Sequence, residues 1–342
     1  MLFRIGRFLP LTIGVLSAVS TTSSLSMSAV EVIRSIGGLP AHIAASFDEP
    51  IGFVQASSGE FLVLDRRAHT VYIVDAKKTA AKKLLQIGLE SGRILGPGVL
   101  ALGPNDLFAV ADAPGKAERI QLFSLTGTWS GGFYLDTRVA ERLVVGPMVL
   151  NGVGSMHYSG TSFIVNQPES GALISELNTQ GHVVRRIGTL RATGHESDTD
   201  LHLALNVGVP LVDPAGGYFF VFQTGVPLLR KYDASGTLIF ERHLEGPELD
   251  NDIRGLPTTW PRRESDHLPL VPPLVRAAAV DRAGRVWVSF MQPFTYVYDA
   301  RGEKVRTVQF QAAGTIAPTS LFFAADDRLL VTPGCYEFSS VK

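Results

Sequence analysis

Short apolar segments separated by polar turns recur along most of the chain. In six places an apolar strand, a tight turn of Gly, Asn, Asp or Ser, and a second apolar strand follow one another. These turn residues tolerate a left-handed backbone or hydrogen-bond to it, so each repeat predicts a β-hairpin. The hairpins span residues 52–65, 98–112, 154–167, 209–223, 277–290 and 320–334.

A second pattern follows each of the first five hairpins. It consists of a third apolar strand, a polar turn and a fourth strand, and the turn usually contains a glycine. These glycines are Gly127, Gly181, Gly236 and Gly302. Five segments therefore predict a four-stranded sheet each, whereas the sixth hairpin is followed only by CYEFSSVK and lacks a fourth strand.

An isolated strand near the start of the chain matches the missing one. The sequence VIRSIG at 32–37 has the pattern of VVRRIG at 183–188, which is a predicted fourth strand. We expect it to complete the sixth sheet and to bury Val32, Ile33 and Ile36. The fold class is then all-β: a six-bladed β-propeller whose last blade is completed by an N-terminal strand, which leaves few unpaired strand edges.

One segment also resembles a known repeat family. Residues 49–75, EPIGFVQASSGEFLVLDRRAHTVYIVD, resemble an NHL repeat, and the likeness is partial at 96–112. The resemblance implies a propeller of the NHL-like superfamily. It carries no catalytic residue, and Asp65 and Asp112, which match the family's Asp at the end of the second strand, are expected to cap a turn.

Composition limits the classes of partner. The formal net charge is −1, with 31 basic and 32 acidic residues. Such a balance gives no field to hold a polyanion, so we expect no nucleic-acid partner. The only cysteine, Cys335, has no partner for an internal disulfide and is expected to be a small buried residue.

The first residues are typical of an export signal. Arg4 and Arg7 precede an apolar run that is followed by small polar residues. We expect a signal peptide over 1–29, a secreted or periplasmic location, and no membrane insertion after cleavage. The mature chain, 30–342, is then a single propeller domain with a long loop insert at 245–273.

Two connections from a fourth strand to the next first strand are long, residues 191–203 and 245–273. Both are expected on the same face of the propeller, around one mouth of its channel. Prolines and glycines in the second argue against a regular element there, and its aromatic and charged residues suit a lid over a polar or anionic ligand. The candidate ligand-binding residues are Arg254, Trp260, Arg262, Arg263, Asp266, His267 and Arg276.

A metal site is the alternative. Oxygen ligands from Glu49, Asn151 and Asn206, each near the start of an inner strand, suit Ca²⁺, and His195 and His202 suit Zn²⁺. Some six-bladed propeller hydrolases related to gluconolactonase and paraoxonase hold calcium in this way, although their sequence motifs are not visible here. Arg276 would disfavour a nearby cation. No cofactor is predicted outside this alternative.

Two functions follow from these observations. The first is an exported binding or interaction module for a protein, peptide or small ligand. The second is a metal-assisted hydrolase or lyase with its site at the channel mouth. No GxSxG, P-loop or dinucleotide fingerprint occurs in a convincing context, so the sequence favours the binding module.

Overall fold

The computed structural model describes residues 29–114, 118–135, 141–145, 148–151, 154–265 and 267–339, with 141–145 and 148–151 described by their backbone. The expected signal peptide, apart from Ala29, and Asp266 lie outside these residues. Among the helices that are described, none has the length and apolar character needed to cross a membrane.

Four sheets have four strands each, and within each sheet the strands pair in chain order. The first contains β2 (Pro50–Gln55), β3 (Phe61–Asp65), β4 (Thr70–Val74) and β5 (Ala81–Lys83). The second contains β8 (Pro97–Leu102), β9 (Leu107–Asp112), β10 (Arg119–Ser124) and β11 (Trp129–Tyr134). The third contains β14 (Met156–Tyr158), β15 (Ser162–Val165), β16 (Ala172–Asn178) and β17 (Val183–Thr189). The fourth contains β18 (Gly208–Val212), β19 (Tyr218–Phe222), β20 (Leu228–Tyr232) and β21 (Leu238–His243).

A fifth sheet has nine strands. Its path runs through β22 (Val275–Val280), β23 (Val286–Phe290), β24 (Thr295–Tyr298), β25 (Lys304–Gln311), β1 (Val30–Gly38), β29 (Tyr336–Ser339), β28 (Arg328–Thr332) and β27 (Ser320–Phe323). A short strand, β26 (Thr315–Ile316), pairs with β25 off this path.

Strand β1 joins two groups of strands. From Ser35 to Gly38 it pairs antiparallel with β29, which confirms that the N-terminal strand meets the end of the chain. From Val30 to Arg34 it also pairs parallel with β25, which the sequence did not predict. Because β1 bonds both neighbours, the two groups form one continuous sheet.

The burial expected for β1 is wrong in part. Ile33 is buried, at 9% exposed, but Val32 is 46% and Ile36 60% exposed. One face of β1 packs on the core while the other faces solvent, since successive side chains of a strand point to opposite faces. The strand therefore closes the sheet mainly through its backbone and Ile33.

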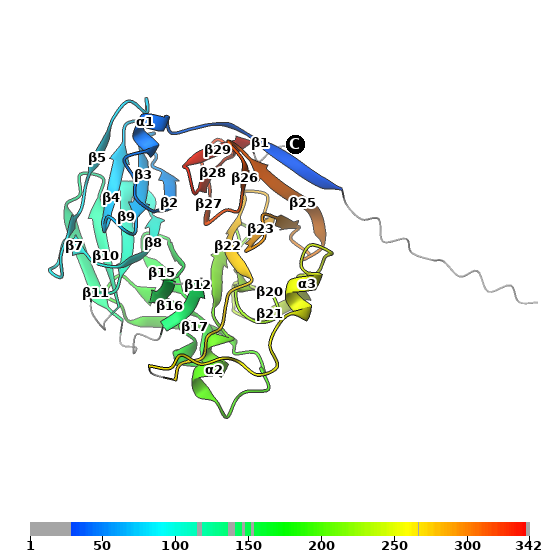
Figure 1. Cartoon of the computed structure of the whole chain (residues 1–342). Helices are drawn as coiled ribbons and strands as arrows, with labels where there is room; N and C mark the ends of the chain where they lie inside the picture. The colour runs from blue at the N-terminus through cyan, green and yellow to red at the C-terminus, as the bar shows by residue number, and fades with distance from the viewer. Residues whose placement is uncertain are drawn as a thin grey trace, which may run out of the picture.

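The sheets stand around a central axis, as Figure 1 shows. Their innermost strands contact one another in a closed ring, in the order β2, β8, β14, β18, β22, β27 and back to β2. Apolar clusters fill the spaces between neighbouring sheets; one joins Phe219 and Val221 of β19 to Val288 and Phe290 of β23. The fold is thus an all-β propeller, with its core between the blades.

Asp65 and Asp112 act as the repeat pattern implied. Asp65 is fully buried, and its carboxylate accepts hydrogen bonds from the backbone N–H of Asp48 (2.7 Å) and Ala68 (2.9 Å). Asp112 accepts one from Leu95 (2.8 Å). Each carboxylate thereby fixes the chain just before an inner strand. Cys335 is buried as expected, and burial raises the pKa of its thiol to about 12.

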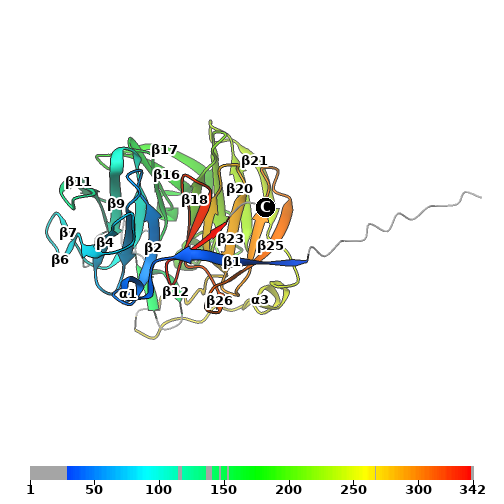
Figure 2. The same ribbon diagram turned by 90° about the horizontal axis from the view of Figure 1, so that it is seen from above.

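The connections carry the remaining elements: α1 (Ala41–Ala44), β6 (Gln86–Ile87), β7 (Arg93–Ile94), η1 (Pro104–Asp106), β12 (Glu141–Val145), β13 (Met148–Asn151), η2 (Pro168–Ser170), α2 (Thr199–Ala204) and α3 (Asp250–Arg254). In Figure 2, α1, β12, β26 and α3 lie along the same side of the propeller. We call this the insert face.

Two features of the insert face correct the sequence interpretation. The insert 245–273 was expected to lack a regular element, but it begins with α3, where Leu249 is buried against the core. A third long connection, between β11 and β14, contains the hairpin β12–β13. Asn151 ends β13 and therefore does not stand at the start of an inner strand.

Candidate functional site

A cavity of about 980 Å³ occupies the centre of the propeller. Residues of all the ring strands, β2, β8, β14, β18, β22 and β27, line it. Its volume lies at the upper end of the range typical of small-molecule sites. Every blade therefore contributes to one shared space.

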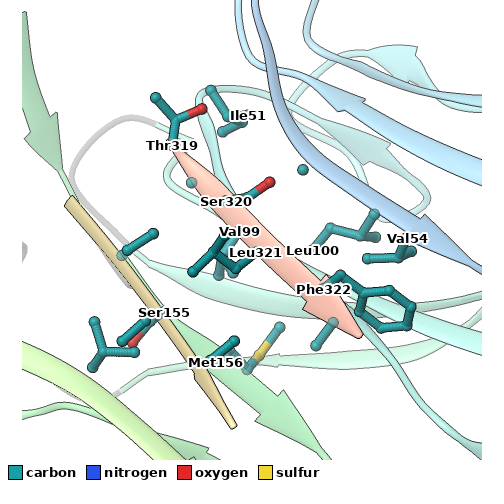
Figure 3. A pocket seen from close by; sticks show the side chains of 18 of the residues that line it. Ile51, Val54, Val99, Leu100, Ser155, Met156, Thr319, Ser320, Leu321 and Phe322 are labelled. Carbon is teal, nitrogen blue, oxygen red and sulfur yellow. The ribbon is translucent and has the colours of Figure 1, made fainter. Parts of the chain in front are cut away.

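Most side chains around this cavity are apolar. Figure 3 shows Ile51 of β2, Met156 of β14 and Leu321 of β27 around the same space, although they come from three different sheets. Further apolar lining residues are Val54, Val99, Leu100, Leu211, Val280, Phe322 and Phe323. An apolar molecule would therefore lose water-exposed surface on entering.

The charged lining residues lie at the insert-face end of the cavity, where the inner strands begin. Glu49 and Arg66 form an ion pair there, in which Arg66 Nε donates to Glu49 Oε2 at 3.0 Å. Asp48 precedes β2 and is exposed. Arg276, the second residue of β22, is the remaining charged side chain among the described residues that line this mouth.

Arg276 stands on a β-bulge. The pairing of β22 with β23 shifts by one residue between Val275 and Ala277, so Arg276 has no partner in the register. The same shift occurs at Ile51 in β2 and at Gly98 in β8. Bulges redirect a side chain and are common beside active sites. The bulge takes Arg276 out of the regular pairing of its strand.

The Arg276 guanidinium has no hydrogen-bond acceptor or carboxylate among the residues that the structure describes. Its Nε is buried and unbonded. Burial lowers the pKa of the group, but an arginine stays charged at neutral pH even so. The mouth therefore contains a partly buried, unpaired positive charge.

His157 lines the cavity from β14. Solvent reaches much of its ring, but the ring stands inside the channel, and the surrounding protein lowers its pKa. The imidazole is therefore neutral at pH 7, and it adds a polar group without a charge.

The polar residues of the insert lie elsewhere. None of its charged side chains within 245–265 and 267–273 is among the cavity-lining residues; only Pro273 of the insert reaches the cavity. Arg262 pairs with Asp198 and donates to the backbone oxygen of His267 at 2.6 Å. Trp260 packs on the cluster formed by Leu201, Ala204, Leu205 and Val271.

Arg254 and Arg263 also bond within the insert. Arg254 Nη2 donates to Asn251 at 2.7 Å within α3, and the backbone N–H of Arg263 donates to Leu268 at 2.9 Å. These contacts tie the insert to itself and to α2. Of the predicted ligand-binding residues, Arg276 is the one that the structure brings to the cavity; Asp266 lies outside the described residues.

Asn206, one of the proposed metal ligands, has hydrogen-bond partners of its own. Asn206 is fully buried, but its Oδ1 accepts from the Arg191 N–H (2.8 Å) and its Nδ2 donates to the His202 carbonyl (2.9 Å). Its amide therefore holds the 191–203 loop in this structure, and a role as a metal ligand stays a prediction. Within the described ranges, no group of three or more His, Cys, Asp or Glu side chains is placed to hold a metal.

The other candidate ligands have different surroundings. Glu49 forms an ion pair with Arg66, and Asn151 is the last residue of β13. The His202 Nδ1 lies 2.8 Å from Thr193 Oγ1 within its own loop, and His195 belongs to the same loop. The long loops do meet on one side of the molecule, because Arg262 of one pairs with Asp198 of the other.

Comparison with known proteins supports the fold. No protein-family model matches the sequence, and no curated protein sequence matches it. Among solved structures, a streptogramin B lyase is similar over 84% of this chain and 76% of that chain, with a TM-score of 0.52 at 12% identity. The chain has a β-propeller fold. This propeller is also similar to regucalcin from Agrobacterium tumefaciens, described as a calcium-binding protein, over 89% of this chain and 88% of that chain (TM-score 0.51, 15% identity).

A third similar structure comes from Bacteroides thetaiotaomicron and has no stated function; it covers 91% of this chain and 75% of that chain (TM-score 0.52, 12% identity). At these identities the likeness concerns the fold alone. A proposal about function therefore rests on the residues that line the cavity, and not on the similar structures.

Proposed function

We propose that the chain is a six-bladed propeller. Six innermost strands in a closed ring support this count, since each hairpin repeat supplies one of them. The nine-stranded sheet then corresponds to two blades, β22–β25 and β27–β29, with the antiparallel half of β1 as the fourth strand of the second.

The proposed function is that of an exported binding module for a small molecule, secreted or periplasmic, which binds its ligand in the central cavity through the insert-face mouth. The observation that carries this proposal is the 980 Å³ cavity with apolar walls and an unpaired guanidinium at its mouth. Large apolar pockets with few convergent polar groups are the usual ligand sites of proteins. The proposal includes neither a nucleic-acid partner nor membrane insertion.

The insert 245–273 has a positioning role in this proposal. Leu249 is buried in the core, and Tyr296 Oη donates to Glu248 at 2.5 Å. Pro273 forms an isolated β-bridge with Thr224, two residues before the start of β22. The insert thereby fixes the entry of β22, on which Arg276 stands, and covers the rim beside the mouth.

Ligand-observed NMR with a fragment library tests the site. Ile51→Trp adds an indole ring inside the cavity and should abolish the signals of fragments that bind the wild-type protein. Val305→Trp, at an exposed position on β25, is the matched control and should leave them unchanged. Fragment signals that survive in the Ile51→Trp protein would place the binding site outside the cavity.

The alternative, a metal-assisted hydrolase or lyase, has less support. Glu49 is paired with Arg66, both ends of the Asn206 amide are bonded, and Arg276 repels a cation at the same mouth. Elemental analysis after exhaustive dialysis tests it independently. One tightly held Ca²⁺ or Zn²⁺ per chain would favour the alternative over the binding module.

A further inference from the structure

We propose that the ligand of the central cavity is an amphipathic anion, with an oxyanion head that pairs with Arg276 and an apolar body that lies along the channel wall. This inference rests on the proposed function, because it assumes that the cavity is a binding site, and it adds the chemical class of the ligand. The observations behind it are the bulge, the charge balance of the mouth and the chemistry of the wall.

The arginine at this bulge requires an explanation. Two other inner strands have the same bulge, at Ile51 in β2 and Gly98 in β8, and there the bulged residue carries no charge. Arginine at this position places a buried, unbonded Nε beside the cavity. A buried polar atom without a partner costs free energy unless another group bonds it. An oxyanion in the mouth would bond the Nη groups of the same guanidinium and neutralise its charge.

Among the described lining residues, Arg276 is also the charge that lacks a partner at the mouth. Arg66 and Glu49 neutralise each other, and His157 is neutral at pH 7 because the channel lowers its pKa. Asp48 is exposed before β2, where water screens its charge. A desolvated guanidinium binds carboxylate, sulfonate or phosphate oxygens in a forked geometry. The mouth therefore favours an anion over a cation.

The wall selects the rest of the molecule. Beyond the mouth, most lining side chains are aliphatic or aromatic, among them Met156, Leu100, Leu211 and Phe322, and His157 and Ser320 are polar exceptions. A small hydrophilic anion would bond Arg276 but leave these surfaces in contact with water. An anion with an apolar body would bury these surfaces, and each Å² of apolar surface removed from water contributes roughly 25 cal/mol to the free energy of binding. The cavity therefore favours a ligand that has both an anionic head and an apolar body.

A matched pair of fluorescent probes tests the inference. 8-Anilino-1-naphthalenesulfonate carries a sulfonate, whereas N-phenyl-1-naphthylamine has the same aromatic body without it. Both are titrated into the wild-type protein, Arg276→Gln, Arg276→Lys and the control Arg254→Gln, an exposed arginine of α3 that bonds only within the insert. Ile51→Trp reports whether each probe occupies the cavity.

We expect Arg276→Gln to raise the Kd of the sulfonate probe about tenfold or more, since hydrogen bonds to charged groups contribute more than neutral ones. The Kd of the neutral probe should change less than about twofold, as both probes keep the same apolar contacts. Arg276→Lys should restore part of the sulfonate affinity, and Arg254→Gln should affect neither probe. Circular dichroism and the Tm of each variant confirm that it is folded.

Two results would overturn the inference in distinguishable ways. In the first, Ile51→Trp abolishes the binding of both probes while Arg276→Gln changes neither Kd, or changes both equally. In that case the cavity binds apolar molecules without regard to charge. The proposed function then stands and the anion class fails. If Ile51→Trp leaves both probes bound, they do not occupy the cavity, and the proposed function fails as well.

Discussion

Two arginines of this propeller show opposite treatments of a buried charge. Arg119 of β10 is 3% exposed, and its guanidinium bonds both carboxylate oxygens of Asp112, at 2.8 and 2.9 Å, and the Arg93 carbonyl at 2.7 Å. Arg276 of β22 has none of these partners among the described residues. The first is a complete structural unit, whereas the second lines the cavity without a carboxylate partner.

The pKa directions follow the same division. Burial acts to lower the pKa of Arg119, but its hydrogen bond with Asp112 and the charge of that residue outweigh burial and raise it. Burial lowers the pKa of Arg276 without such compensation. A buried charge with all its partners indicates architecture; a buried charge without them indicates a site.

The largest effect is expected for Arg119→Met. It leaves Asp112 buried without its partner, and breaking a buried ion pair costs about 3–5 kcal/mol. Urea unfolding should show this loss of unfolding free energy. Adding Asp112→Asn to the variant should recover part of it, because the unpaired charge is removed. A loss below about 1 kcal/mol would mean that the pair is not the structural unit described here.

A smaller effect is expected for Asn206→Ala. The buried amide bonds the Arg191 N–H and the His202 carbonyl, and unsatisfied buried groups cost about 1–3 kcal/mol. The unfolding free energy should fall by that amount whether or not Ca²⁺ is present. A loss that appears only in the presence of Ca²⁺ would return Asn206 to the role of a metal ligand.

Arg276→Met should leave stability nearly unchanged. No bond is broken, and a partly buried charge is replaced by an apolar side chain of similar length, so the change in unfolding free energy should stay within about 1 kcal/mol, in the stabilising direction. The urea midpoints of this variant and Arg119→Met give a direct comparison. A loss of about 2 kcal/mol or more would show that Arg276 is structural too.

The smallest effect concerns pH. The folded pKa of His157 lies below its unfolded value of 6.5, since the channel disfavours the imidazolium. Its contribution to stability is complete above pH 6.5 and is lost as the pH falls towards the lowered folded pKa. The wild-type protein should therefore lose more stability than His157→Gln between pH 7 and 5. The difference should be below about 1 kcal/mol because solvent reaches the ring; parallel curves would contradict the lowered pKa.

Much of the fold could be predicted from the sequence because each repeat is determined by residues that are close together in the sequence. Glycine-containing turns such as that at Gly236, between apolar strands, define β-hairpins whatever surrounds them. The pairing of β1 with β29 followed from one missing strand. The parallel pairing with β25 and the exposure of Val32 and Ile36 did not, since they depend on how two neighbouring blades approach each other.

The site was less predictable. Arg276 was identified as a residue near the start of an inner strand, but its bulge arises from the register between β22 and β23, which a single sequence does not specify. Asn206 also lies near the start of an inner strand, but its side chain accepts a hydrogen bond from the backbone N–H of Arg191. The insert attracted attention through its charges, yet those charges bond to α2 and to one another. These residues differ in their hydrogen-bond and ion-pair partners, which the residue types alone do not reveal.

The two-sided pairing of β1 has a consequence for the order of assembly. Ser35 meets Phe338, and Val30 meets Thr307, so the contacts that join the ring connect opposite ends of the polypeptide. Contacts of such sequence separation form slowly. During synthesis, the edges of the first strand stay unpaired until nearly all other strands exist, and a nascent chain is most vulnerable to edge-to-edge association in that interval.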